Sequence, residues 1–158
     1  MERALVFLTE PNAARRKAVL TLLHRVPSVT TRTFGTLVET RRAMRAGLPK
    51  LMIGPWSQGG ETLLAARATV AGNAAAGKVP QVLILTDTVS SSRISLARQA
   101  GDAELIPCDP LDEEGLFNRV TLLLRGAEAL YDPLDEERRS ALDSALENLP
   151  ALRRRLVA

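Results

Sequence analysis

The sequence of 158 residues predicts an α/β domain built on a doubly wound, five-stranded parallel sheet. Short apolar runs of strand length alternate with segments of helical periodicity, and this alternation repeats five times within about the first 125 residues. Apolar residues make up 46% of the chain and charged residues 25%, which is typical of a folded globular protein. Right-handed crossovers between parallel strands favour the flavodoxin-like arrangement, in which functional sites lie beyond the carboxyl ends of the strands.

The first strand–helix unit lies between Ala4 and Pro27. Ala4–Leu8 is a continuous apolar run, as expected for a strand buried on both faces. Asn12 can cap the helix that follows, because its side chain accepts a hydrogen bond from an unpaired N–H of the first turn. Pro27 marks the end of this unit. The apolar face of the helix comprises Ala14, Ala18, Val19, Leu22 and Leu23.

Four further units follow the same rule. The other expected strands are Val29–Arg32, Leu51–Gly54, Gln81–Thr86 and Glu104–Ile106. The other expected helices begin at about Thr36 and cover Glu61–Ala71, Ser92–Ala100 and Asp112–Arg125. The helix after Thr36 should place Leu37, Val38 and Met44 inward. Gly47 and Gly101 should close the second and fourth helices, because glycine readily adopts the C-terminal cap conformation.

Composition excludes several classes of site. The single cysteine cannot form an internal disulfide, and one cysteine with one histidine cannot build a zinc site without many carboxylates. The apolar runs fall far short of the ~20 residues that a membrane span needs. The N-terminus lacks the basic start, apolar core and cleavage site of a signal peptide, so we expect a cytoplasmic protein without a membrane contact. We expect no metal and no cofactor.

Polar residues follow several of the expected strands, and their order carries a resemblance. Thr9 and Glu10 follow the first strand, Gly54 to Ser57 end the third, and Thr86-Asp87 end the fourth. Over about residues 3–126 the chain resembles a bacterial response-regulator receiver domain. The matching features are the run Leu48–Ile53 into the third strand, Gly59-Gly60, Val82–Thr86, Ala100-Gly101-Asp102 and Pro110 near the end of the fifth strand.

The resemblance implies a phosphorylation site that this sequence has largely lost. The family uses an acidic pair for Mg²⁺, an aspartate that accepts phosphate, a hydroxyl and a lysine. Here the acidic pair is reduced to Glu10, the phosphoacceptor position is Pro55, and the lysine position falls on Cys108 or Asp109. Only the hydroxyl of Thr86 remains. We therefore interpret the chain as a degenerate receiver, or pseudo-receiver, that is not an enzyme.

Single residues near this position have alternative interpretations. Trp56 could anchor a partner, since tryptophan is enriched at interface hot spots, or it could fill the vacated acidic pocket, and the sequence favours neither. Thr86 and Asp87 are better explained as satisfying backbone groups at a strand end than as binding a small ligand. Cys108 is expected to be a small buried apolar residue. The resemblance implies a cis peptide at Asp109-Pro110.

Charge is unevenly distributed along the chain. Residues 1–60 carry ten basic and three acidic side chains, whereas residues 110–158 carry seven basic and ten acidic ones. A basic N-terminal region can indicate nucleic-acid binding. The basic residues Arg15, Arg16 and Lys17 lie on the first helix, however, and Arg41, Arg42 and Arg45 on the second. These helices should cover opposite faces of the sheet, which argues against one continuous nucleic-acid surface.

We divide the chain into a receiver-like domain, residues 1–126, and a C-terminal helical extension, residues 127–158. A leucine stripe in the extension comprises Leu142, Leu146 and Leu149. It could fold back on the domain or pair with a second chain, and the segment could also lead into a longer protein.

These observations predict a non-catalytic, phosphorylation-independent adaptor that binds another signalling protein. The resemblance implies a binding face around the fourth helix, fifth strand and fifth helix, with Arg98, Glu104 and Arg119. The chain could also form a homodimer, through this face or through the leucine stripe. The alternative is a transcription-type regulator that contacts nucleic acid through the basic N-terminal helices.

Overall fold

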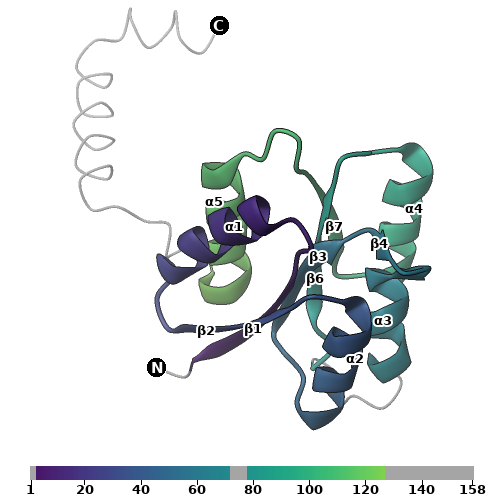
Figure 1. Cartoon of the computed structure of the whole chain (residues 1–158), viewed down its shortest axis with the longest axis horizontal. Coiled ribbons are helices and arrows are strands. Elements are labelled where there is room, and N and C mark those ends of the chain that lie inside the picture. Colours follow the sequence, from purple (N-terminus) through teal and green to yellow (C-terminus); the bar gives the residue numbers. More distant parts are fainter. Residues whose placement is uncertain (1–2, 72–77, 127–158) are drawn as a thin grey trace, which may run out of the picture.

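The computed structural model describes residues 3–71 and 78–126 (Figure 1). In this part of the chain, five parallel strands form one sheet in the order β2-β1-β3-β6-β7. The strands are β1 (Ala4–Thr9), β2 (Val29–Phe34), β3 (Leu51–Pro55), β6 (Gln81–Thr86) and β7 (Ala103–Pro107). The predicted fold class is confirmed. The leucine stripe of Leu142, Leu146 and Leu149 lies outside the described residues.

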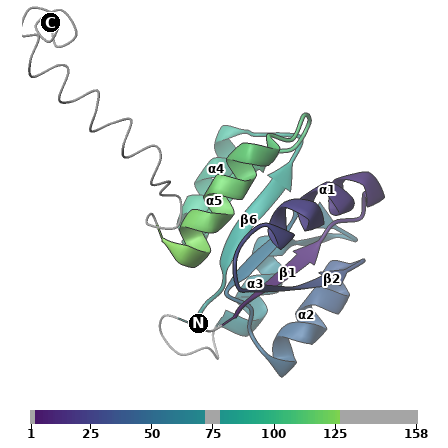
Figure 2. The same ribbon diagram turned by 90° about the vertical axis from the view of Figure 1, so that its left-hand side faces the viewer.

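Helices cover both faces of the sheet (Figures 1 and 2). On one face lie α1 (Ala13–His24) and α5 (Glu113–Arg125), which contact each other. On the other lie α2 (Leu37–Ala46), α3 (Leu63–Ala71) and α4 (Ser91–Ala100). The arginine-rich stretches of α1 and α2 are therefore on opposite sides of the molecule, as expected from the topology.

Alternation along the strands divides the core into two layers. Val6 and Leu8 of β1 pack with Val19 and Leu23 of α1, whereas Phe7 between them packs on the opposite face. Successive side chains of a strand point to opposite faces, so one strand supplies both layers. The two layers explain why the strands have continuous apolar sequences.

Side-chain caps set the helix starts. The side-chain oxygen of Asn12 accepts a hydrogen bond from the Arg15 N–H at 2.9 Å, which confirms the predicted cap. Thr36, Ser90 and Asp112 cap α2, α4 and α5 in the same way. Each cap satisfies an N–H that has no partner within the helix.

Three local expectations are wrong. Val38 is 42% exposed, because α2 turns Leu37, Thr40 and Met44 inward and the position after Leu37 is rotated away by about 100°. Ala14 in the first turn of α1 is also exposed, since the buried face of that helix begins only at Val19. The third helix begins at Leu63, because Glu61 and Thr62 belong instead to a small hairpin.

That hairpin consists of β4 (Ser57–Gln58) and β5 (Glu61–Thr62). Gly59 and Gly60 form its turn with φ of +60° and +79°, a conformation that other residues rarely adopt. The Gln58 side chain accepts a hydrogen bond from the Leu37 N–H and donates one to the Gly35 carbonyl, both at 2.9 Å. The hairpin is thereby attached to the start of α2.

No helix in residues 3–71 or 78–126 combines the length and the apolar character that a membrane crossing requires. The Asp109-Pro110 peptide is cis, as the resemblance implied.

Candidate functional site

The carboxyl ends of β1, β3, β6 and β7 bring together the residues that the sequence singled out at this edge. Glu10 follows β1 and is 1% exposed. Its Oε1 atom accepts hydrogen bonds from the Asn12 N–H at 3.0 Å and from Arg15 Nη1 at 3.5 Å. Arg16 Nη1 donates to the Glu10 carbonyl at 3.1 Å. The start of α1 and Arg15 therefore hold the carboxylate, and Arg16 binds the main chain of the same residue; from sequence, both arginines were assigned only to a basic cluster on the first helix.

The donor set at this edge does not fit Mg²⁺. Within the described residues no group of three or more histidine, cysteine, aspartate and glutamate side chains could hold a metal ion. Magnesium binding needs several hard oxygen ligands in octahedral geometry. Here the one buried carboxylate is already bonded to a cation, because Arg15 contacts its Oε1 atom. Glu10 Oε2 has no hydrogen-bond partner among the described residues, and one free oxygen does not make a magnesium site.

Pro55 occupies the end of β3 next to Leu85 of β6. It has no nucleophilic atom, so it cannot accept a phosphoryl group. Gly54 precedes it at a close approach of elements: a Cβ atom there would lie 3.2 Å from Leu63 Cδ2 and 3.2 Å from the Thr9 carbonyl oxygen. This edge of the sheet is therefore tightly packed by α3.

Arg93 organises the other side of the edge, and sequence reasoning missed it. Its Nη1 atom donates to Thr86 Oγ1 at 2.8 Å, and its guanidinium carbon lies 4.9 Å from the centre of the Trp56 ring. A guanidinium at this distance from an indole face makes a favourable cation–π contact. Arg93 follows the cap residue Ser90 by three positions, and nothing in the sequence shows that the first turn of α4 faces the end of β6.

The Thr86 hydroxyl has a complete set of hydrogen bonds. It donates to the Thr88 carbonyl at 3.0 Å and accepts from the Thr88 N–H at 3.1 Å and from Arg93. A hydroxyl has one donor and two acceptor positions, and all three are used here. This agrees with the interpretation that Thr86 satisfies groups at a strand end. Asp87 is exposed and bonds to the neighbouring Thr88 hydroxyl at 3.3 Å.

The two candidates for the lysine position differ in environment. Cys108 is 5% exposed and belongs to the core layer of α1 and α5, as expected for a small apolar residue. Burial raises the pKa of the Cys108 thiol; Arg15 opposes this rise, whereas Glu10, Asp87 and Asp109 add to it. Asp109 is exposed. Neither residue supplies a cation.

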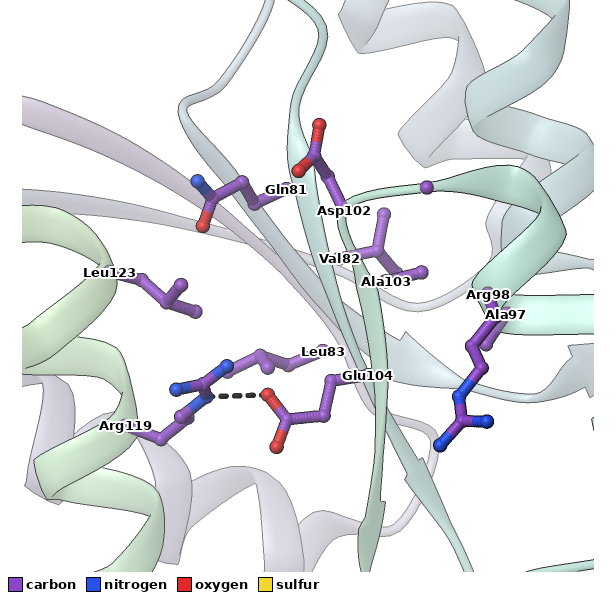
Figure 3. Close-up of a pocket in the computed structure, with 11 residues that line it drawn as sticks. Gln81, Val82, Leu83, Ala97, Arg98, Asp102, Ala103, Glu104, Arg119 and Leu123 are labelled. Atoms are coloured by element: carbon purple, nitrogen blue, oxygen red, sulfur yellow. Dashed lines mark hydrogen bonds and ion pairs between the residues drawn. The ribbon is translucent and has the colours of Figure 1, made fainter. Parts of the chain in front are cut away.

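The face of α4, β7 and α5 carries Arg98, Glu104 and Arg119 (Figure 3). Arg119 of α5 pairs with Glu104 of β7, and both side chains are about two-fifths exposed. Arg98 lies on the other side of the β7 ribbon from Arg119 and is exposed. These residues line a shallow hollow of about 320 Å³. Leu96 on α4 is 50% exposed, although it does not line that hollow.

Arg67 of α3 is a second charged residue that sequence reasoning missed. It is 4% exposed and donates to four main-chain carbonyls, those of Pro80, Ala100, Gly101 and Asp102. The interaction joins α3 to the C-terminal end of α4 and to the start of β6 and β7. It thereby positions the α4 side of the face described above.

Comparison with known proteins identifies the fold. No protein-family profile matches the chain, and no curated protein is significantly similar in sequence. Solved structures do match. A response regulator receiver protein from Pseudomonas putida has a TM-score of 0.62 at 19% identity, covering 76% of this chain and 97% of that protein.

Two further structures match equally well. The receiver domain of the Francisella response regulator 1452 has a TM-score of 0.64 at 12% identity, covering 77% of this chain and 96% of its own. A DNA-binding response regulator of the LuxR family from Staphylococcus aureus has a TM-score of 0.63 at 15% identity, covering 76% and 98% respectively. Residues 3–71 and 78–126 therefore have the fold of a response-regulator receiver domain.

Proposed function

We propose that the chain is a phosphorylation-independent, receiver-like signalling adaptor that acts by binding another protein. The observation that carries this proposal is the state of the carboxyl edge of the sheet. Side chains there bond to one another: Thr86 to Arg93, and Glu10 to the start of α1. Pro55 stands at the phosphoacceptor position that the resemblance implies, and it cannot form an acyl phosphate.

The same arrangement supports the interpretation of Trp56 as a filling residue. Trp56 is half-buried, packs against the core layer of α2 and α3, and lies beneath the Arg93 guanidinium. A phosphoryl group that approached Thr86 would have to displace Arg93 and break the cation–π contact. Because Pro55 has no nucleophilic atom, no new bond to phosphorus would compensate for the loss of that contact.

The proposed partner surface is the face of α4, β7 and α5. It combines an apolar side chain, Leu96, with the charged residues Arg98, Glu104 and Arg119. Protein interfaces characteristically combine exposed apolar anchors with a polar rim. This surface does not include Pro55, so binding there does not require a phosphoryl group at the carboxyl edge of the sheet.

One experiment tests independence from phosphorylation. The full chain, labelled with ¹⁵N, is titrated with beryllofluoride and Mg²⁺, which together imitate an aspartyl phosphate. We expect no saturable shift of the amide signals of Thr86, Trp56 and Cys108. A Pro55→Asp variant serves as the comparison, because it restores a carboxylate at that position. Saturable shifts in the unaltered chain would contradict the proposal.

A second experiment tests the partner face. A photo-crosslinking amino acid replaces Leu96 on α4 or, as a matched control, Val38 on α2, since these apolar residues are similarly exposed at 50% and 42%. In the native host we expect a discrete adduct with another protein from position 96 and none from position 38. Equal adducts from both positions would show non-specific contact. An adduct of twice the chain mass would identify a second copy as the partner.

A further inference from the structure

The amino ends of the strands carry a second and larger hollow, at the edge opposite Glu10 and Thr86. Its volume is about 890 Å³, and it lies where β1 and β6 begin, beside the end of α5. Four of its lining residues are cationic: Arg3, Lys50, Lys78 and Arg125. None of the described lining residues is acidic. The hollow therefore concentrates positive charge without compensation from carboxylates in its wall.

The cations are held in place by neutral oxygen atoms. Arg3 donates to Thr30 Oγ1 at 3.0 Å and to the Val29 carbonyl at 3.2 Å. Arg125 donates to the carbonyls of Pro27 and Ser28. Such bonds orient a guanidinium and leave its charge unneutralised. In these bonds each arginine donates through Nε and Nη2, which leaves three of its five N–H groups available to an anion.

The two lysines offer further donors. Lys50 Nζ donates to the Leu124 carbonyl at 3.1 Å, which leaves two of its three N–H groups available. Lys78 is exposed and has no hydrogen bond or ion pair with the described residues. Gln81 lines both this hollow and the one between α4, β7 and α5, and its buried Oε1 atom has no hydrogen-bond partner among the described residues. An occupant that fits must bring carboxylates for these cations, and an acidic polypeptide does so.

The sequence contains such a segment directly after the hollow. Residues 128–137 carry five acidic side chains and no basic one: Glu128, Asp132, Asp135, Glu136 and Glu137. Glu128 follows the lining residue Arg125 by three positions, and an extended chain advances about 3.5 Å per residue. About 10.5 Å of extended chain thus separates the first carboxylate from Arg125, and about 42 Å separates the last. The segment is thus long enough to bring its carboxylates within one Debye length, about 8 Å, of the cations.

We propose that the basic hollow at the amino edge of the sheet binds the acidic residues 128–137 of the same chain. The contact brings five carboxylates to four cations and joins the C-terminal segment to the domain. It also gives a role to part of the basic excess in residues 1–60, because Arg3 and Lys50 belong to it. The interaction is electrostatic, and none of its four cations lines the hollow on the partner face of α4, β7 and α5.

The test uses the full chain and neutralises charge at a distance from the hollow. In a ¹⁵N-labelled Glu136→Gln, Glu137→Gln variant we expect the amide signals of Lys50, Lys78 and Gln81 to shift, and that of Thr86 at the opposite edge to stay in place. A matched control, Asp143→Asn with Glu147→Gln, removes the same two charges from the same tail outside the acidic segment. It should leave the hollow unchanged. Raising the salt concentration to 0.5 M should roughly halve the difference between the unaltered chain and the double variant.

Three results would overturn the proposal. Equal shifts from the control variant would mean that only net charge is sensed. Signals at the hollow that change on tenfold dilution of the unaltered chain would assign the occupant to a second copy. In the third, inorganic phosphate is titrated into the unaltered chain: saturable shifts at the hollow with phosphate, and none from the double variant, would show a site for small anions.

A charge swap, Lys78→Glu with Glu137→Lys, should restore the signals that Lys78→Glu alone disturbs.

Discussion

Arg67 offers the sharpest test of how the α4 side of the domain is held. The side chain is 4% exposed, yet no carboxylate contacts it among the described residues. Its shortest bonds are from Nη2 to the Gly101 carbonyl at 2.7 Å and to the Ala100 carbonyl at 3.0 Å, at the C-terminal end of α4. A cation is favourable at a helix C-terminus, where carbonyl groups lack partners within the helix.

The perturbation is Arg67→Met, which keeps an unbranched apolar stem and removes all four hydrogen bonds to the main-chain carbonyls. Hydrogen bonds from a charged donor are worth about 1.5–3 kcal/mol each, and the two short bonds dominate. Burial lowers the pKa of the Arg67 guanidinium, against a smaller opposing effect of Asp102, so removing the charge also relieves a desolvation cost. The net loss of folding stability should therefore be about 2–4 kcal/mol. Domains of this kind have about 5–15 kcal/mol in total.

The assay is urea unfolding of the full chain, monitored by the fluorescence of Trp56, the only tryptophan. The midpoint should fall by roughly 1–2 M. The urea midpoint of Arg67→Lys should lie between those of the unaltered chain and of Arg67→Met, because an ammonium can reach only some of the carbonyls. Arg98→Met is the matched control: Arg98 is exposed on α4, and its loss should change stability by less than about 0.5 kcal/mol. A loss below about 1 kcal/mol for Arg67→Met would show that the carbonyls find other donors, and would refute the reasoning.

Two further predictions concern the carboxyl edge. Burial raises the pKa of the Cys108 thiol above its ordinary value of 9.0, so the stability that the neutral thiol contributes is complete below about pH 9 and is lost as the pH rises through the folded-state value. The urea midpoint of the unaltered chain should therefore fall relative to that of Cys108→Ala between pH 8 and pH 10.5; a constant difference would contradict the burial argument. Arg93→Met removes the contact with Trp56 and the bond to Thr86, so acrylamide should quench the tryptophan more strongly. Arg42→Met on α2 should leave quenching unchanged, and equal quenching in both variants would exclude the stacked arrangement.

The pattern of the sequence was sufficient to predict the sheet and most helix boundaries. Buried parallel strands need apolar residues on both faces, and helices need one apolar face and a cap, so both requirements appear as local periodicity. The strand Gln81–Thr86 and the cap at Asn12 were predicted for this reason. Where two signals compete within a few residues, local pattern fails: Glu61 and Thr62 precede an apolar helical run, but the glycine pair before them forms a hairpin turn.

What the sequence by itself determined is the order of elements, the positions at the carboxyl edge and the absence of a nucleophile at Pro55, since these follow from residue type and spacing. Tertiary structure alone decided which charged side chains meet them. Arg93 reaches Thr86 and Trp56, Arg15 reaches Glu10, and Arg67 reaches the end of α4. The packing of elements distant in sequence determines which partners a long, flexible side chain contacts, and local periodicity carries no information about these contacts. The same reason explains why the four cations of the amino-edge hollow, scattered from residue 3 to residue 125, could be grouped only after the chain was folded.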